Sequence, residues 1–358
     1  MIRVRPALLE DLEAINAVWV RNGMFSFNPD DTRHWWLSHP FREEFKGVPI
    51  GWVLESSHSE VVGTFTNVHM MYDLEGRRFK GAIAGSWAVD TKHRNSSLML
   101  AMAYFSQQRI DVCINGSASR VASRLMPVFK ALRIPSDDYD LSYFWITNRR
   151  AFAASALRWK KIPLAGTLSP LVALGLWGRD LRCTGRRRSA ADVRQFTEFG
   201  VEFDRFWEKV RQGPRRLRAV RTAAVLDWRF GSALRNKRAT VLGLIHGDEM
   251  LGYVVLRENV REHLSLRQFI IADLQALEDS PTVLLGLIDA AREATRQANM
   301  DALEWQGWSS QKRRVAQSLR PLTHRYPVWP LFYKALNPEL ATPLSRPDTW
   351  DFSPFDAF

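Results

Sequence analysis

The stretch Gly85-Ser-Trp-Ala-Val-Asp-Thr-Lys-His-Arg-Asn-Ser-Ser-Leu98 decides how the first part of the chain is interpreted. Trp87, Ala88 and Val89 predict a buried strand, and the polar residues after them predict a turn that opens a helix over 98–107. The first free N–H groups of a helix, together with its dipole, favour a bound anion. A strand that ends in an arginine-containing turn at a helix start is therefore a candidate phosphate site.

The composition is that of an ordinary globular protein. Of its 358 residues, 46% are hydrophobic and 25% are charged, and the length suggests two domains. The sequence has no run of about 18 apolar residues, so we expect no membrane insertion, and its N-terminus lacks the apolar core of a signal peptide. The two cysteines, Cys113 and Cys183, make no disulfide framework, and we expect a reduced, cytoplasmic protein.

The order of predicted elements indicates a mixed α/β protein with two units. Residues 1–150 read as a strand, two helices, three strands, a helix, a strand and a helix, with a parallel crossover near the middle. Residues 151–215 are basic and interrupted by prolines, and we expect them to form an irregular linker. From residue 216 to residue 358 a hairpin, a strand, a long helix over 282–299, a strand and a helix follow, which predicts a second domain.

Several local features resemble a known superfamily. The strand-like segments Ile50-Gly-Trp-Val-Leu54 and Val61-Val-Gly-Thr-Phe65, the turn from Val89 to Arg94 and the element order of residues 1–150 resemble a GCN5-related N-acetyltransferase (GNAT) domain. The second unit looks like a further GNAT-like domain with trimmed ends. The fold class expected is therefore α/β, with two tandem GNAT-like domains whose mixed central sheets are flanked by helices. Such a fold hosts many activities, so the chemistry must be argued from the site.

The resemblance implies an acyl-donor site between the strands over 84–89 and 110–114. There the thioester carbonyl of an acyl-CoA would accept a hydrogen bond from a backbone N–H near Ala88 or Val89, and the pyrophosphate would lie on the following turn. The residues expected to contact the donor are Trp87, Ala88, Val89, Arg94, Asn95, Ser96, Ser97 and Leu98, with Asn115 holding the pantetheine arm. No metal is expected, because the histidines His34 and His39 have no further His or Cys partner.

This chain departs from the superfamily's glycine pattern, Gln/Arg-x-x-Gly-x-Gly/Ala. Arg94 fits it, whereas Ser97 and Met99 stand where glycines are expected. Ser97 can cap a helix or bind phosphate, but a Met side chain crowds a close backbone approach. Three interpretations remain open: a CoA donor in a displaced pose, an acyl carrier protein or aminoacyl-tRNA as donor, or an inactive domain.

A strongly basic block supports the second interpretation. The net charge is +12, and residues 179–238 contain 17 Lys/Arg against 7 Asp/Glu. Such a block attracts an acidic carrier protein, tRNA, CoA phosphates or anionic lipid. It is equally consistent with a solvated linker in which arginine stems cover apolar surface.

The acceptor side of the site is expected on the face of the hairpin formed by residues 51–55 and 61–68 and on the N-terminal helices. His69 suits a general base for the acceptor amine, although a solvent-facing strand histidine is equally compatible with the sequence. Ser119 starts the helix where the superfamily often has a tyrosine that protonates the departing thiolate. The residues expected to line the acceptor pocket are His34, Trp35, Trp36 and Tyr72, and the tryptophans are also compatible with core packing.

The sequence thus predicts an N-acyltransferase. It would transfer an acyl group, acetyl in the simplest case, from acyl-CoA to the amine of a small molecule or amino sugar by direct attack. The alternatives are a GNAT-fold transferase that uses acyl carrier protein or aminoacyl-tRNA as donor, and a catalytically inactive binding protein.

Overall fold

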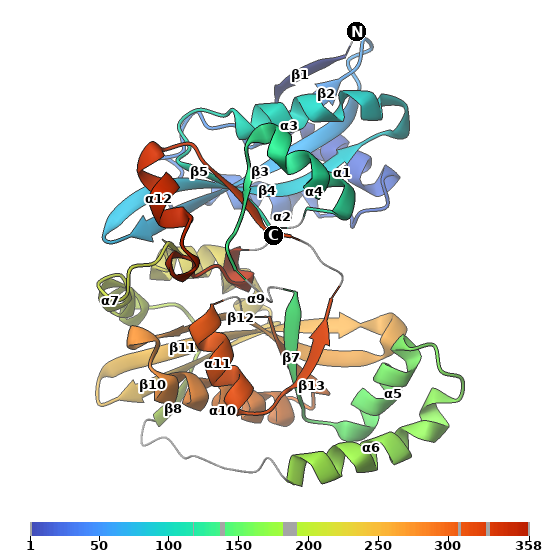
Figure 1. The fold of residues 1–358 in the computed structure, drawn as a ribbon, viewed down its shortest axis with the longest axis vertical. Coiled ribbons are helices and arrows are strands. Elements are labelled where there is room, and N and C mark those ends of the chain that lie inside the picture. The colour runs from blue at the N-terminus through green and yellow to red at the C-terminus, as the bar shows by residue number, and fades with distance from the viewer. Residues whose placement is uncertain are drawn as a thin grey trace.

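Two mixed sheets, each flanked by helices, form the molecule (Figure 1). The computed structural model describes residues 2–116, 118–136, 140–181, 192–306, 309–326 and 330–356. Within these residues no helix is long and apolar enough to cross a membrane. The α/β class and the two mixed sheets confirm the expected fold class.

The first sheet has the strand order β1-β2-β3-β4-β5-β15-β6, with β9 paired to β3. Its members are β1 (Arg3–Pro6), β2 (Gly51–Glu55), β3 (Val61–Leu74), β4 (Arg77–Val89), β5 (Val112–Asn115), β6 (Leu132–Arg133), β9 (Arg218–Ala219) and β15 (Phe332–Ala335). Only β4 and β5 run parallel, and the other pairs are antiparallel. The crossover between β4 and β5 is the one expected from the sequence.

The helices of the first half are α1 (Leu12–Arg21), α2 (Pro29–Leu37), α3 (Ser97–Phe105), α4 (Arg120–Leu125) and α12 (Ala341–Leu344). The buried residues of α1 recur at helical spacing and pack with Trp36 against the sheet. α4 is short, because it gives way to a 3-10 helix over Met126–Phe129 that contains Pro127. Val121 and Val128 of this segment are exposed.

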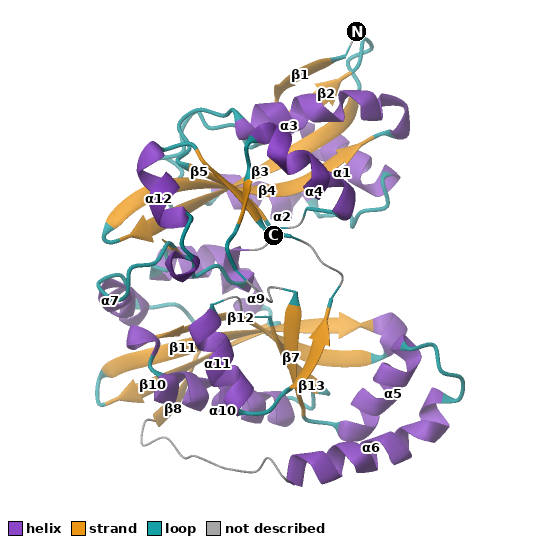
Figure 2. Cartoon of the chain, in the orientation of Figure 1, coloured by secondary structure: helices purple, strands orange, loops and turns teal. Residues whose placement is uncertain are grey.

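The second sheet has the strand order β14-β7-β13-β12-β11-β10-β8. Its members are β7 (Leu141–Ile146), β8 (Asp192–Phe196), β10 (Ala239–His246), β11 (Glu249–Arg261), β12 (Leu266–Ala276), β13 (Ala302–Trp305) and β14 (Leu322–Arg325). The helices of this half are α5 (Arg149–Trp159), α6 (Ala165–Leu181), α7 (Val201–Val210), α8 (Ala223–Leu226), α9 (Ser232–Arg235), α10 (Pro281–Gln297) and α11 (Ser310–Ser318) (Figure 2). As in the first sheet, one pair, β12 and β13, runs parallel.

The two halves exchange a strand. β7 lies between β13 and β14 of the second sheet, and β15 lies between β5 and β6 of the first. In Figure 1 the green β7 accordingly stands in the lower half and the red C-terminal helix α12 in the upper half. The expected boundaries at residues 150 and 216 therefore do not separate the sheets, because a short apolar strand does not reveal its partner.

The segment over 151–215 is more regular than expected. It contains most of α5, together with α6, β8 and α7, and Pro170 stands inside α6. Residues 182–191 of this segment lie outside the described part. The largest core cluster crosses between the halves, because it includes Phe65 and Met70 of the first sheet together with Phe203 and Tyr253 of the second half.

Candidate functional site

The edge of β4 loses its partner at its carboxyl end. β4 and β5 pair in parallel only where Gly81–Ile83 face Val112–Ile114. β4 then continues to Val89, whereas β5 ends at Asn115. One side of the last residues of β4 is therefore left without a neighbouring strand.

Tyr104 of α3 lies where the two strands part. Its hydroxyl is 2.7 Å from the carbonyl oxygen of Ala82 in β4 and 2.9 Å from that of Ile114 in β5. The single hydroxyl proton is shared between these two acceptors, and the buried ring stacks on Phe65. Sequence reasoning missed Tyr104, because a tyrosine on an apolar helix face carries no signal of this contact.

A bulge in the β3–β4 pairing precedes the free edge. The register shifts between Phe65 and Asn67, and the N–H of Ser86 donates to Oγ1 of Thr66 at 2.8 Å. A Cβ atom on Gly85 would lie 2.2 Å from the same oxygen, so only glycine fits there. The bulge turns the following residues of β4 relative to the sheet.

Two backbone N–H groups of β4 face the side where β5 has ended. The N–H of Asp90 donates to the carbonyl of Val62 in β3 at 2.9 Å. Because successive N–H groups of a strand point to opposite sides, the N–H of Ala88 also faces β3, and those of Trp87 and Val89 face away from it. They are preformed donors for a carbonyl oxygen or an oxyanion.

The turn after β4 presents positive charge. Residues Thr91–Ser96 form a 3-10 helix that runs into α3. Lys92 and Arg94 are exposed there, and no polar contact of their side chains appears within the described residues. The carboxylate of Asp90 is already neutralised by Arg21 at 2.8 Å. Two exposed cations thus lie beside the N-terminus of α3, where an anion is favoured.

The residues expected at the donor site come together around this edge. Trp87 stacks on Phe65 at 5.3 Å, and Ala88 packs toward α1. The turn residues Asn95, Ser96, Ser97 and Leu98 follow Arg94, and Met99 exposes 41% of its surface. Asn115 is buried at the end of β5, where its backbone pairs with Phe332 of β15.

His69 does not face this edge as a base would. Its ring stacks on Phe45 at 4.7 Å, and its Nε2 lies 3.2 Å from the carbonyl oxygen of Pro49. Burial lowers the pKa of His69 to about 4. This placement argues against the expected role as general base, because the ring is enclosed in the core.

The three aromatic residues expected to line an acceptor pocket serve to attach α2. Trp36 is buried, and its Nε1 donates to the carbonyl of Asn67 at 3.0 Å. Trp35 meets the ring of Trp228 edge-on at 5.2 Å, and Nε2 of His34 lies 3.3 Å from the carbonyl oxygen of Trp228. Their interpretation as a pocket is therefore not supported, because Trp36 packs against β3 and the other two contact the π-helix over Asp227–Gly231.

Tyr72 and Ser119 also have structural partners. Tyr72 is buried, and its hydroxyl donates to Oδ1 of Asp356 at 3.2 Å. Ser119 is exposed at the start of α4, where its side chain accepts a hydrogen bond from the N–H of Ala122 at 3.2 Å. These placements argue against an acceptor-binding role for Tyr72 and show Ser119 as a helix cap.

The second half repeats the strand separation but closes it. β12 and β13 pair in parallel only where Gln268–Ile270 face Ala302–Glu304, and β12 continues to Ala276. The C-terminal residues 351–354 lie against this free edge, and they enclose with it a cavity of about 10 Å³. That volume holds about one water molecule. The second separation is therefore filled by the chain's own C-terminal segment.

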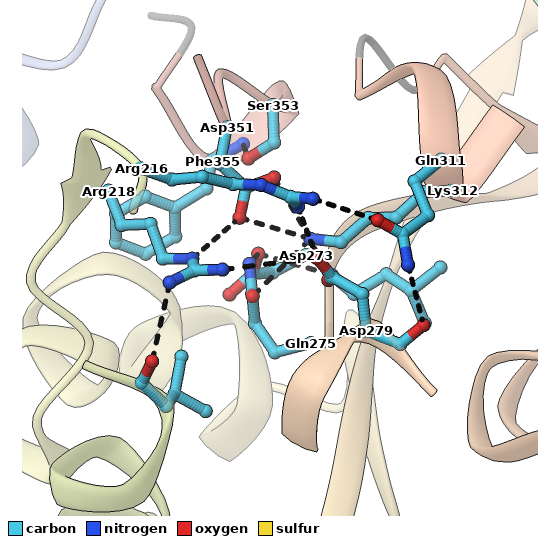
Figure 3. Close-up of polar contacts among 12 residues, drawn as sticks. Arg216, Arg218, Asp273, Gln275, Asp279, Gln311, Lys312, Asp351, Ser353 and Phe355 are labelled. Atoms are coloured by element: carbon cyan, nitrogen blue, oxygen red, sulfur yellow. Dashed lines mark hydrogen bonds and ion pairs between the residues drawn. The ribbon is translucent and has the colours of Figure 1, made fainter. Parts of the chain in front are cut away.

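Buried charges hold this segment in place. We call the side chains of Arg216, Arg218, Arg221, Lys312, Asp273, Asp279, Asp351 and Asp356 the interdomain ionic network. Figure 3 labels all of them except Arg221 and Asp356. Nε of Arg221 lies 2.9 Å from Oδ2 of Asp273, and Nε of Arg218 lies 3.0 Å from Oδ2 of Asp351. The arginines come from the segment around β9, which pairs with the first sheet, and Asp273 comes from β12 of the second.

The network shifts the ionisation of its own carboxyl groups. Burial alone opposes the charged form of Asp351, but Lys312 and Arg218 outweigh it and hold the pKa of Asp351 well below its usual value. Burial raises the pKa of Asp356 to about 6. Sequence reasoning missed the network, because its members lie far apart along the chain.

Seven basic side chains of the block form ion pairs within the molecule. Lys209 pairs with Glu249, Arg211 with Asp73, Arg215 with Glu75 and Arg235 with Asp227, while Arg216, Arg218 and Arg221 belong to the interdomain ionic network. The arginines over 186–188 lie outside the described residues. Within the described ranges, no group of three or more His, Cys, Asp or Glu side chains is placed to hold a metal ion.

Comparison with known proteins extends to structure alone. No family model and no curated protein sequence matches this chain. A GCN5-related N-acetyltransferase from Anabaena variabilis ATCC 29413 matches 94% of this chain and 73% of its own, with a TM-score of 0.57 and 11% identity. A GCN5-related N-acetyltransferase from Kribbella flavida matches 96% of this chain and 72% of its own, with a TM-score of 0.57 and 14% identity.

A third solved structure agrees. A conserved protein of unknown function from Enterococcus faecalis V583, described as a probable N-acyltransferase, matches 94% of this chain and 73% of its own. Its TM-score is 0.58 and its identity 11%. Each match extends over both halves of the chain, and the protein therefore has the fold of the GCN5-related N-acetyltransferases.

Proposed function

We propose that the protein is an N-acyltransferase that binds an acyl-CoA along the free edge of β4 in its first half. The acceptor is the amine of a small molecule or amino sugar. One observation carries this proposal: the N–H groups of Trp87 and Val89 face the side where β5 has ended, beside the exposed cations Lys92 and Arg94. The equivalent edge in the second half is filled by residues 351–354, so one donor site is proposed.

The reaction is a direct transfer. The amine nitrogen attacks the thioester carbonyl, the new C–N bond forms, and the C–S bond breaks. The proton lost by the amine ends on the thiol of CoA. The N–H of Val89 would stabilise the oxyanion that develops on the carbonyl oxygen, while Arg94 and Lys92 would hold the phosphates.

A carrier-bound donor is the second candidate. The N–H of Ser97 already donates to the carbonyl of Arg94, and glycines are missing from the turn. Fewer backbone groups are thus left for a pyrophosphate than a glycine-rich turn offers. The internal ion pairs weaken the attraction of the basic block for an acidic carrier, because they neutralise part of its cations.

Calorimetric titration with acetyl-CoA and with longer acyl-CoAs tests the donor. We expect micromolar binding, weakened about tenfold or more by Arg94→Ala, because a charge-assisted hydrogen bond contributes about 1.5–3 kcal/mol. Arg346→Ala, another exposed arginine, is the matched control and should bind like the wild type. If no acyl-CoA binds while an acylated carrier protein or aminoacyl-tRNA does, the CoA assignment is wrong. If none of them binds, the chain is a non-catalytic protein.

Val89→Pro tests the oxyanion contact separately from binding. Proline removes the N–H of Val89, which donates no bond to β3, and we expect acyl-CoA affinity within threefold of the wild type. The release of CoA thiol in the presence of a panel of amino sugars and primary amines should fall about 10²–10³-fold in kcat. Val89→Ala keeps the N–H and controls for the lost side chain. An unchanged kcat in Val89→Pro would remove this N–H from the mechanism.

A further inference from the structure

The helix α6 is packed to the molecule along one narrow stripe. Ala165 and Ser169 are buried, and Ala173 and Leu176 are half-buried. Their spacing of four, four and three residues places them on a single face of the helix. All other side chains of α6 that the structure describes, up to Gly178, are exposed.

The large apolar side chains point away from that stripe. Leu171 and Leu174 expose 71% and 63% of their surfaces, and their spacing of three residues puts them on one face of α6. Leu164, directly before the helix, exposes 74%. Eight of the 23 exposed large hydrophobic residues of the described chain lie between residues 159 and 177: Trp159, Ile162, Leu164, Leu168, Leu171, Val172, Leu174 and Trp177. An exposed apolar surface of this extent marks an interaction site.

The hairpin of α5 and α6 is strongly basic, and Asp180, near the end of α6, is its one acidic residue. Residues 149–178 contain five cations and no Asp or Glu: Arg149, Arg150, Arg158, Lys160 and Lys161. Lys160 and Lys161 are exposed at the turn that leads from α5 to α6. The apolar face of α6, next to the exposed Lys160 and Lys161, complements a surface that is apolar inside and negatively charged at its boundary.

We propose that the α5–α6 hairpin, residues 149–178, docks on the surface of an anionic lipid bilayer. The 17-residue α6 would lie in the plane of the headgroups with its leucines inserted and its neighbouring lysines among the phosphates. Trp177, near the C-terminal end of α6, is of the residue type that favours this boundary. In Figure 1, α6 lies at the outer edge of the second half, on the far side from the first sheet, so docking leaves the candidate donor site uncovered.

A second copy of the chain is a poorer occupant for this face. A twofold interface through α6 would bring two hairpins together, each with five cations and no acidic residue between positions 149 and 178. Like charges oppose such a contact, whereas they attract an anionic lipid surface.

Vesicle flotation of the full chain tests the proposal. We expect binding to phosphatidylcholine vesicles that contain 30% phosphatidylserine, weaker binding at 500 mM NaCl than at 100 mM, and little binding to phosphatidylcholine alone. The double change Lys160→Gln, Lys161→Gln should lower the partition coefficient about 25-fold, about fivefold for each cation. Leu171→Asp with Leu174→Asp should lower it at least about tenfold.

Val201→Asp is the matched control, since Val201 is 57% exposed at the start of α7 and its change introduces the same chemistry elsewhere. It should bind vesicles like the wild type, and the thermal unfolding midpoint of each variant shows that it is folded. The proposal is overturned if the wild type does not bind anionic vesicles, or if Val201→Asp loses as much binding as the double leucine variant. A wild-type dimer that Leu171→Asp converts to a monomer, without vesicle binding, would assign the face to a second copy.

Discussion

Val89 and His69 lie in neighbouring strands, but only Val89 has a polar group that faces an open edge. The N–H of Val89 faces the side that β5 leaves open, whereas the ring of His69 is enclosed by Phe45 and Pro49. β3 is buried at every position from Val62 to Leu74, so no alternation of polar and apolar residues marks an inner and an outer face. A histidine in such a strand is indistinguishable, by sequence, from one that faces solvent.

The buried histidines predict how stability depends on pH. Burial lowers the pKa of His69 to about 4 and that of His39 to about 3, so the unfolded chain, with a histidine pKa of 6.5, takes up protons first. The contribution of the neutral histidines to the free energy of unfolding is therefore fully present above pH 6.5. It is lost as the pH falls from 6.5 toward the folded-state pKa values. The raised pKa of Asp356, about 6, acts in the opposite direction, because its protonated form favours the fold as the pH falls from 6 to 4.

Urea unfolding of His69→Gln at pH 7.5 and pH 5 checks this. The variant should be less stable at both pH values, but its stability should fall by about 2 kcal/mol less than that of the wild type between them. His58→Gln, at an exposed turn position, should keep the wild-type dependence. Parallel pH dependences for His69→Gln and the wild type would show that His69 is protonated in the folded protein.

At the scale of elements, the same arrangement has two outcomes. In both halves a bulged strand extends past the end of its parallel neighbour: β4 extends past β5, and β12 extends past β13. The first free edge keeps two N–H groups without a strand partner, while the second is covered by the C-terminal segment over 351–354. The difference comes from the interdomain ionic network, which anchors that segment through buried charge pairs.

Asp351→Asn tests the anchor. The change leaves Lys312 and Arg218 buried without the carboxylate that now lies 3.1 Å and 3.0 Å from them. We expect the free energy of unfolding to fall by about 3–5 kcal/mol, measured by denaturant unfolding, because an uncompensated buried charge is costly. Asp348→Asn, at an exposed position three residues earlier, should change it by less than about 0.5 kcal/mol. A loss below about 1 kcal/mol for Asp351→Asn would mean that the network does not hold the segment.

At the scale of the whole molecule, the exchanged strands make the two halves one folding unit. β15 supplies the strand between β5 and β6, and β7 supplies the strand between β13 and β14. The core cluster that spans both halves adds to this dependence. A fragment that ends before β15 therefore leaves the first sheet with unpaired backbone groups on two strands.

A split chain measures this dependence. Fragments 1–185 and 186–358 should co-purify in equal amounts when expressed together, and each alone should be unfolded or insoluble by circular dichroism. Tyr333→Pro in the second fragment should abolish co-purification, because Tyr333 lies between Ile114 and Leu132 in the sheet. Tyr333→Phe keeps the backbone donor and is the control. Two fragments that fold independently would contradict the exchange.

The sequence by itself determined the local structure over 87–98 and several other helices and strands, although not the helices within 151–215. The strand-like segment over 50–54 overlaps β2, and the residues over 87–98 do form a strand, a turn and a helix start. These properties are local, because hydrophobic spacing and turn residues act within a few positions of the chain.

Only the tertiary structure decided which strands pair, which of the two free edges stays open and which polar residues are enclosed. Ile114 pairs with Tyr333, Tyr72 contacts Asp356, and His69 is buried. Each of these features depends on segments that lie far apart in the sequence, or on a choice among strands with similar sequences. A short apolar strand satisfies its backbone equally well beside several partners. The choice among them is made by packing and buried charge pairs that exist only once the chain has folded.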